Sequence, residues 1–191
     1  SGTMMTLSIL CGFLPTLLIS PFAGVWADRY DRKLLIVIAD AAIALCTLIL
    51  ALLFLGGYDS IWLLFAASAI RSVGAGVHSP ALNAFLPQFV PQEHLTRVHA
   101  VMGMIHSTMT LLSPMLSAAL LTVASIEVIF FVDVVTAAIA VAILLLFLDV
   151  PAHRRAHEVQ KTGYFADLRA GLAYVSKHDY LKAFFAFNAV F

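Results

Sequence analysis

Five apolar runs, each long enough to cross a lipid bilayer, constrain this chain more than any other feature of its sequence. They cover residues 5–27, 34–55, 61–86, 98–122 and 127–148. A helix needs about 20 mainly apolar residues to cross about 30 Å of hydrocarbon. Water is absent there, so each run must satisfy its own backbone hydrogen bonds, which an α-helix does. The sequence therefore predicts an all-α integral membrane protein with five full transmembrane helices.

The composition agrees with a membrane protein and argues against other classes. The 191 residues are 62% hydrophobic and 12% charged, whereas soluble domains have about 25% charged residues. The formal net charge is zero, which argues against a nucleic-acid partner. Cys11 and Cys46 each stand alone in an apolar run, and we interpret them as small buried hydrophobic side chains.

Basic residues occur in alternate connections between the predicted helices. The turns at 56–60 and 122–127 contain no Lys or Arg. The other connections contain Arg29, Arg32, Lys33, Arg97, Arg154, Arg155 and Lys161. Basic loops stay in the cytoplasm, so we expect the first and fifth helices to run from outside to inside. Residues 1–149 are then a multi-pass bundle in the plasma (inner) membrane.

The remainder of the chain is more polar. We expect residues 150–179 to be a cytoplasmic loop, because Pro151 ends the fifth helix and a basic segment follows. Apolar residues at helical spacing predict a short helix on the inner membrane surface: Phe165, Leu168, Leu172 and Val175. This helix is either a plain connector or a contact for anionic headgroups. His153 and His157 have no further ligand nearby, so no metal site is predicted.

The final run, residues 180–191, is too short to span a membrane, and we expect it to begin another helix. The chain also opens on apolar sequence without a signal peptide. We therefore expect it to be an internal fragment of a longer protein.

The connection between the first two helices carries a recognisable motif. It reads Gly24-Val25-Trp26-Ala27-Asp28-Arg29-Tyr30-Asp31-Arg32-Lys33. This resembles the G-x-L-A-D-R-x-G-R-K loop between helices two and three of major facilitator transporters, with Trp26 and Asp31 as departures. We expect Gly24 to allow close helix approach and Asp28 to accept hydrogen bonds at a helix N-terminus. The basic residues Arg29, Arg32 and Lys33 should anchor the inner surface.

A second stretch resembles the drug-efflux branch that includes macrolide exporters. It comprises Ile70-Arg71-Ser72-Val73-Gly74-Ala75-Gly76, Ser79-Pro80-Ala81 and Leu86-Pro87-Gln88-Phe89-Val90-Pro91. The resemblance implies a partial N-terminal half of a twelve-helix bundle, namely helices two to six, the central loop and the start of helix seven. Gly74, Gly76, Pro80 and Pro114 become candidates for helix packing or hinges. Around Pro114, serine and alanine replace the glycines of the family's fifth-helix motif.

Three charged residues fall within the predicted helices away from their ends, where an ionised group costs about 2.5–3.5 kcal/mol. Arg71 is near the midplane, Asp40 is about 10 Å from the cytoplasmic side, and Asp133 is about two turns below the outer surface. One interpretation is a buried ion pair that fixes helix register, with Asp40 and Arg71 at similar depth. The other makes Arg71 the counter-charge of a proton-carrying carboxylate, Asp40 or Asp133.

Two histidines, His78 and His106, also fall within predicted helices. We interpret both as groups that form hydrogen bonds between helices, although either could titrate near neutral pH.

The resemblance implies export of amphipathic small molecules, such as macrolide-like drugs, by proton-coupled alternating access. The implied partners are membrane lipid, a hydrophobic or cationic substrate, protons and the C-terminal half of the same protein. Alternatives are export of a siderophore or other metabolite on the same fold, or a non-transporting membrane sensor. The sequence contains neither a G-x-x-x-x-G-K-[ST] loop nor an H-E-x-x-H helix, so we predict no cofactor and no enzymatic activity.

The predicted orientation can be tested by labelling single cysteines in the whole protein, in a background without Cys11 and Cys46. We expect an impermeant thiol reagent to label Tyr58→Cys from outside intact cells and to leave Arg155→Cys unlabelled until the cells are opened. Labelling of position 155 in intact cells would contradict the orientation.

Overall fold

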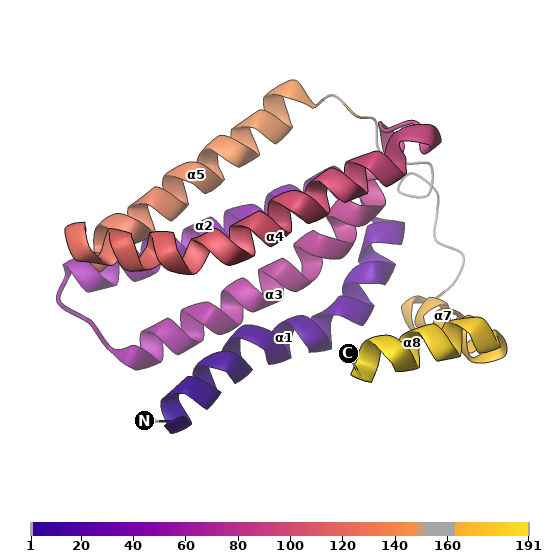
Figure 1. The fold of residues 1–191 in the computed structure, drawn as a ribbon, viewed down its shortest axis with the longest axis horizontal. Helices are drawn as coiled ribbons and strands as arrows, with labels where there is room; N and C mark the ends of the chain where they lie inside the picture. The colour runs from indigo at the N-terminus through magenta and orange to yellow at the C-terminus, as the bar shows by residue number, and fades with distance from the viewer. Residues whose placement is uncertain (1, 149, 151–162, 191) are drawn as a thin grey trace.

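The computed structural model describes residues 2–148, 150 and 163–190, and over these residues it is helical without strands (Figure 1). Its elements are α1 (Gly2–Arg29), α2 (Arg32–Leu55), α3 (Ile61–Phe85), the 3-10 turn η1 (Leu86–Gln88), α4 (Gln92–Val123), α5 (Ile126–Phe147), α7 (Tyr164–Lys177) and α8 (Asp179–Val190). Five of them, α1 to α5, are long and apolar enough to cross a membrane. The predicted all-α class and the five spans are therefore confirmed.

The helix ends follow local sequence signals. Asp31 caps α2 by accepting a hydrogen bond from Lys33 N at 2.9 Å, and Ser60 caps α3 through Trp62 N. Gly57 follows the end of α2 with φ of +83°, a conformation that glycine adopts at little cost. The expectations that concern residues 151–162, including Pro151, His153, His157 and the basic residues there, lie outside the described residues.

Four of the long helices pack side by side in an order that differs from their order in the chain. Extensive contacts join α1 to α3, α3 to α2, and α2 to α5 (Figure 1). The spatial order is therefore α1, α3, α2, α5. No residue of α4 is buried, and α4 has no comparable contact with these four helices.

Two glycines allow α3 to approach both of its neighbours closely. A Cβ atom at Gly76 would lie 2.2 Å from Ile19 Cγ2 and 3.2 Å from Thr16 Cα on α1. A Cβ atom at Gly74 would lie 2.6 Å from Ile43 Cγ1 on α2. Small residues at such positions are how membrane helices bring their backbones together. The close approach expected at Gly24 is not made, because a Cβ atom there would meet no described atom within 4 Å.

Both prolines expected to act in helix packing or as hinges lie inside helices. Pro80 lies within α3 and Pro114 lies within α4. Each lacks an N–H group and so leaves the carbonyl four residues earlier without its usual helical partner.

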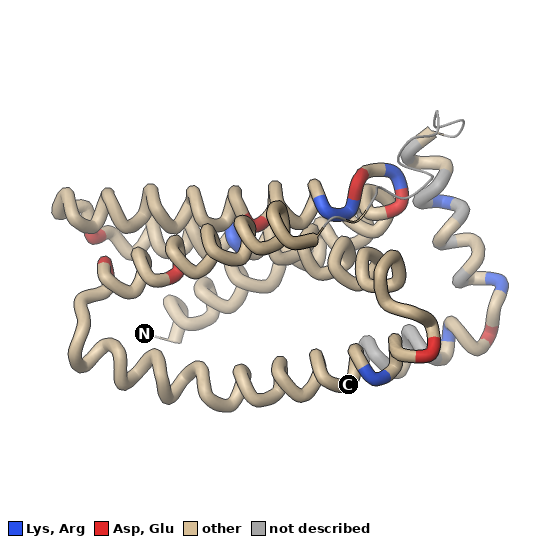
Figure 2. Tube along the Cα trace, turned by 90° about the horizontal axis from the view of Figure 1, so that it is seen from above, with Lys and Arg blue, Asp and Glu red and all other residues tan. Residues whose placement is uncertain are grey.

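Charged residues are distributed unevenly along the bundle (Figure 2). In the described part of α1 to α5, the Lys and Arg residues lie at the end of the bundle that holds the C-termini of α1 and α3. The one exception in this part is Arg71, which lies in the middle of α3. The opposite end has acidic residues only, Asp59 and Glu127. This distribution is the one that the positive-inside rule describes.

The Gly76 contact leads to a stability prediction. We expect Gly76→Ala to destabilise the whole protein by about 1–3 kcal/mol, because the new methyl group meets the α1 backbone and overpacks the contact. Thermal unfolding in detergent, followed by the loss of monodisperse protein, measures this. Gly24→Ala is the matched control and should leave the midpoint unchanged. An equal midpoint for Gly76→Ala and the wild type would contradict the packing described above.

Candidate functional site

A polar cluster joins α2, α3 and α5 within the bundle. Arg71 on α3 forms an ion pair with Asp133 on α5, through Nη1 and Oδ2, and also donates to Thr47 Oγ1 on α2. Thr47 Oγ1 lies 3.2 Å from Asp133 Oδ2 and 3.0 Å from Ile43 O. Thr47 is 2% exposed, so its hydroxyl is buried with these groups as its partners. The charge of Arg71 is therefore balanced within the bundle.

Of the two carboxylates considered as partners of Arg71, the structure places Asp133 beside it and Asp40 elsewhere. Asp40 Oδ1 instead lies 3.5 Å from His78 Nε2. Asp40 is seven residues before Thr47 on α2, and His78 is seven residues after Arg71 on the antiparallel α3. Seven residues are about two turns and about 10 Å of helix, so the two helices place the polar pairs at two separate levels.

The two candidate carboxylates are therefore separated by the structure. Asp133 belongs to the cluster with Arg71, and Asp40 belongs to a contact nearer the C-terminal end of α3. His78 has the interhelical partner expected of it, whereas His106 lies exposed on α4.

Thr47 is the member of the cluster that sequence reasoning missed. Threonine is unremarkable in a membrane helix, where its hydroxyl can bond to the preceding turn. The available signal was its spacing, because seven residues place Thr47 on the same face of α2 as Asp40.

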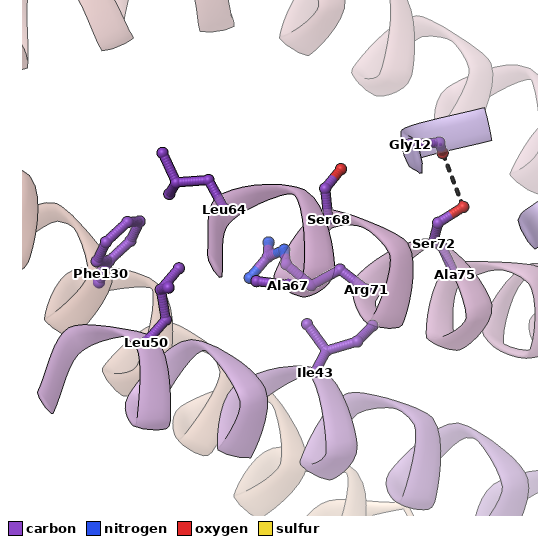
Figure 3. A pocket seen from close by; sticks show the side chains of 10 residues that line it. All are labelled: Gly12, Ile43, Leu50, Leu64, Ala67, Ser68, Arg71, Ser72, Ala75 and Phe130. Carbon is purple, nitrogen blue, oxygen red and sulfur yellow. Dashed lines mark hydrogen bonds between the residues drawn. The ribbon is translucent and has the colours of Figure 1, made fainter. Parts of the chain in front are cut away.

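Arg71 also lines a cavity of about 430 Å³ between α1, α2, α3 and α5. The remaining lining is mostly apolar and consists of Gly12, Ile43, Leu50, Leu64, Ala67, Ser68, Ser72, Ala75 and Phe130. In Figure 3 the Arg71 guanidinium points toward the side occupied by Leu64, Leu50 and Phe130, and Ser72 points toward Gly12 of α1. The cavity thus combines an apolar wall with one cationic group, which Asp133 neutralises.

The motif between α1 and α2 forms a second site, at the end of the bundle. Arg32 donates from Nε to Ala27 O at 2.8 Å and from Nη1 to Ala84 O at 2.7 Å. Lys33 Nζ donates to Leu148 O at 2.6 Å. These carbonyls lie at the C-terminal ends of α1, α3 and α5, where helices lack internal donors and carry partial negative charge. Two adjacent cations thus join three helix ends to the start of α2.

The two acidic residues of the motif, Asp28 and Asp31, lie on either side of the turn between α1 and α2. Asp28 lies in the last turn of α1, and its Oδ1 lies 3.6 Å from Arg32 Nη2. The carboxylate that accepts at the N-terminus of α2 is Asp31, and the acceptor role expected of Asp28 stays a prediction. Arg29 ends α1, where a cation interacts favourably with the helix dipole.

Comparison with known proteins identifies relatives of this arrangement. The sequence matches the model of the Major Facilitator Superfamily over residues 1–191. It is 32% identical to macrolide efflux protein A of Enterococcus faecalis over 183 residues, which are 95% of this chain and 56% of that protein. It is 31% identical to macrolide efflux protein A of Streptococcus pyogenes, over 96% of this chain and 45% of that protein.

A more distant relative is multidrug resistance protein 1 of Bacillus subtilis, 26% identical over 86% of this chain and 41% of that protein. The chain thus spans about half the length of the curated relatives that it matches. No solved structure gives a significant match.

The contacts of Arg32 generate a prediction for the whole protein. We expect Arg32→Ala to lower the free energy of unfolding by about 1–3 kcal/mol, since two helix-end carbonyls lose their donor. Arg32→Lys should recover part of this loss, because lysine keeps the charge without the guanidinium fork. Thermal unfolding in detergent checks both variants, with Arg97→Ala on the exposed face of α4 as the control. Equal midpoints for Arg32→Ala and Arg97→Ala would contradict a stabilising role for the contacts of Arg32 with the helix ends, which together with those of Lys33 form a clamp.

Proposed function

The chain belongs to the Major Facilitator Superfamily, and we propose that it is part of an exporter of amphipathic small molecules that is driven by proton influx. It is a multi-pass membrane protein of a transporter family rather than an enzyme. The names of its relatives support macrolide-like drugs as the substrate class. We place the whole protein in the plasma (inner) membrane, in contact with lipid.

The observation that carries this proposal is the ion pair between Arg71 and Asp133 within the bundle. A lone charge in hydrocarbon is expensive, whereas a hydrogen-bonded pair offsets the desolvation of both groups. A proton bound to Asp133 removes the negative charge that holds Arg71. The proton and the Arg71 guanidinium therefore compete for the same carboxylate.

This competition links proton binding to helix packing. Asp133 lies on α5 and Arg71 on α3, with Thr47 of α2 between them. Protonation of Asp133 weakens the contact between α3 and α5, and loss of the proton restores it. The Arg71 and Asp133 side chains are about 40% exposed, so protons can reach the pair from the open side of the row of helices.

Alternating access requires two bundles that move against each other around a central site. Transport is therefore proposed for the whole protein, with its other helices as the partner of the bundle described above. The clamp formed by Arg32 and Lys33 would keep the ends of α1, α3 and α5 together during that movement.

Transport by the whole protein in inverted membrane vesicles tests the role of the pair. We expect Arg71→Ala and Asp133→Asn each to reduce uptake of a macrolide driven by a pH gradient by at least about tenfold, the factor that corresponds to 1.4 kcal/mol. Exchange of macrolide without a gradient should persist, because that exchange needs no net proton movement. Arg97→Ala is the charge-matched control and should transport normally.

Two further results make the test decisive. The double variant Arg71→Leu/Asp133→Leu should fold stably, since it removes both charges of the pair together and leaves neither unpaired, and it should also lose gradient-driven uptake. Gradient-driven uptake at the wild-type rate in Arg71→Ala and Asp133→Asn would contradict the proposed coupling.

A further inference from the structure

A side chain of α3 enters the backbone hydrogen-bond ladder of α1. Ser72 Oγ donates to Gly12 O at 2.7 Å and accepts from Thr16 N at 3.1 Å. An unbroken α-helix joins these two backbone groups directly, because each N–H bonds to the carbonyl four residues earlier. Ser72 is 5% exposed, and its hydroxyl points at α1 in Figure 3. The serine hydroxyl therefore bonds both to a helical donor of α1 and to the acceptor that this donor would otherwise use.

The same turn of α1 contains a second source of bending. Pro15 lacks an N–H group and cannot bond to the carbonyl of Cys11. Sharp kinks in helices arise at prolines and where a side chain inserts into the ladder, and both causes coincide within residues 11–16. The ribbon of α1 bends along its length in Figure 1, and a further proline, Pro21, lies in the later part of the same helix.

The contact between Ser72 and Thr16 is reinforced from both sides. Thr16 Oγ1 donates to Ser72 O at 2.6 Å, so each residue bonds to the backbone of the other. One turn further along α3, Gly76 allows the Thr16 backbone to approach closely. The two helices thus meet through backbone atoms rather than through long side chains.

Ser72 directly follows Arg71, and the two residues serve different neighbours. Successive residues of an α-helix point about 100° apart. Arg71 reaches α2 and α5, and Ser72 reaches α1. A rotation of α3 that changes one of these contacts therefore changes the other.

We propose that Ser72 is a positioning residue through which α3 sets the bend of α1. With its hydroxyl inserted between Gly12 and Thr16, α1 is bent, and when the hydroxyl withdraws, Thr16 N bonds to Gly12 O and α1 straightens. The further step, in which release of Arg71 from Asp133 withdraws Ser72, rests on the proposed function. The insertion itself does not depend on that function.

The bend can be measured by pulsed electron paramagnetic resonance on the whole protein, with Cys11 and Cys46 replaced by serine. Spin labels at Met5→Cys on α1 and Trp62→Cys on α3 report the outer segment of α1, and both positions are exposed. Labels at Tyr30→Cys and Asn83→Cys report the opposite end as an internal reference. We expect Ser72→Ala to shift the distance between positions 5 and 62 and to leave the distance between positions 30 and 83 unchanged.

Ser68→Ala is the matched control, because Ser68 lies one turn earlier on α3 and lines the same cavity. It should leave both distances unchanged. Thr16→Val removes the bond to Ser72 O without adding bulk, so it should shift the distance between positions 5 and 62 in the same direction as Ser72→Ala. Thr16→Ser keeps the hydroxyl and should behave like the wild type. An unshifted distance in Ser72→Ala, or an equal shift in Ser68→Ala, would overturn the proposal.

The same labels separate this proposal from the proposed coupling. A shift in Ser72→Ala with none in Asp133→Asn would support the hinge and refute its link to the ion pair. Loss of gradient-driven uptake in Asp133→Asn, together with unchanged distances in Ser72→Ala, would refute the hinge and leave the transport function standing.

Discussion

Hydrocarbon offers no hydrogen-bonding partner, so every polar group that enters it must find one within the protein. In the described bundle these partners come from neighbouring helices. Arg71 bonds to Asp133 and Thr47, and Ser72 bonds to the backbone of α1. At the bundle end, Arg32 and Lys33 donate to carbonyls that three helices leave free. The position of each charged or polar side chain therefore depends on which helices pack beside it.

Helix α3 is the element that these contacts share. It meets α1 through Ser72 and Gly76, and it meets α2 through Gly74 and His78. Through the ion pair of Arg71 with Asp133, α3 also contacts α5. Because close-packed interfaces switch between discrete arrangements rather than deform continuously, a change in the Arg71 ion pair is expected to move α3 as a unit. Arg71 of the proposed proton site and Ser72, which contacts α1, are adjacent on this helix although they contact different neighbours.

The structure adds most to the sequence predictions in identifying which residues on different helices form ion pairs and hydrogen bonds with each other. The depth expected for Arg71 in the membrane follows from counting residues along a helix. Depth alone nevertheless suggested Asp40 as its partner, whereas the structure pairs Arg71 with Asp133 and Asp40 with His78. The cap of α2 likewise had to come from the structure, because helix α1 continues through Asp28 and the chain turns only at Asp31.

The sequence by itself determined the helices, their approximate ends and the distribution of loop charge. Each of these depends on local quantities, namely the length of apolar runs, capping residues and the bilayer thickness. Only the tertiary structure decided that α1, α3, α2 and α5 lie in that spatial order, that Thr47 completes the charged cluster, and that Ser72 enters the ladder of α1. A helix presents a residue every 100°, and which of these directions faces a neighbour depends on packing among distant segments.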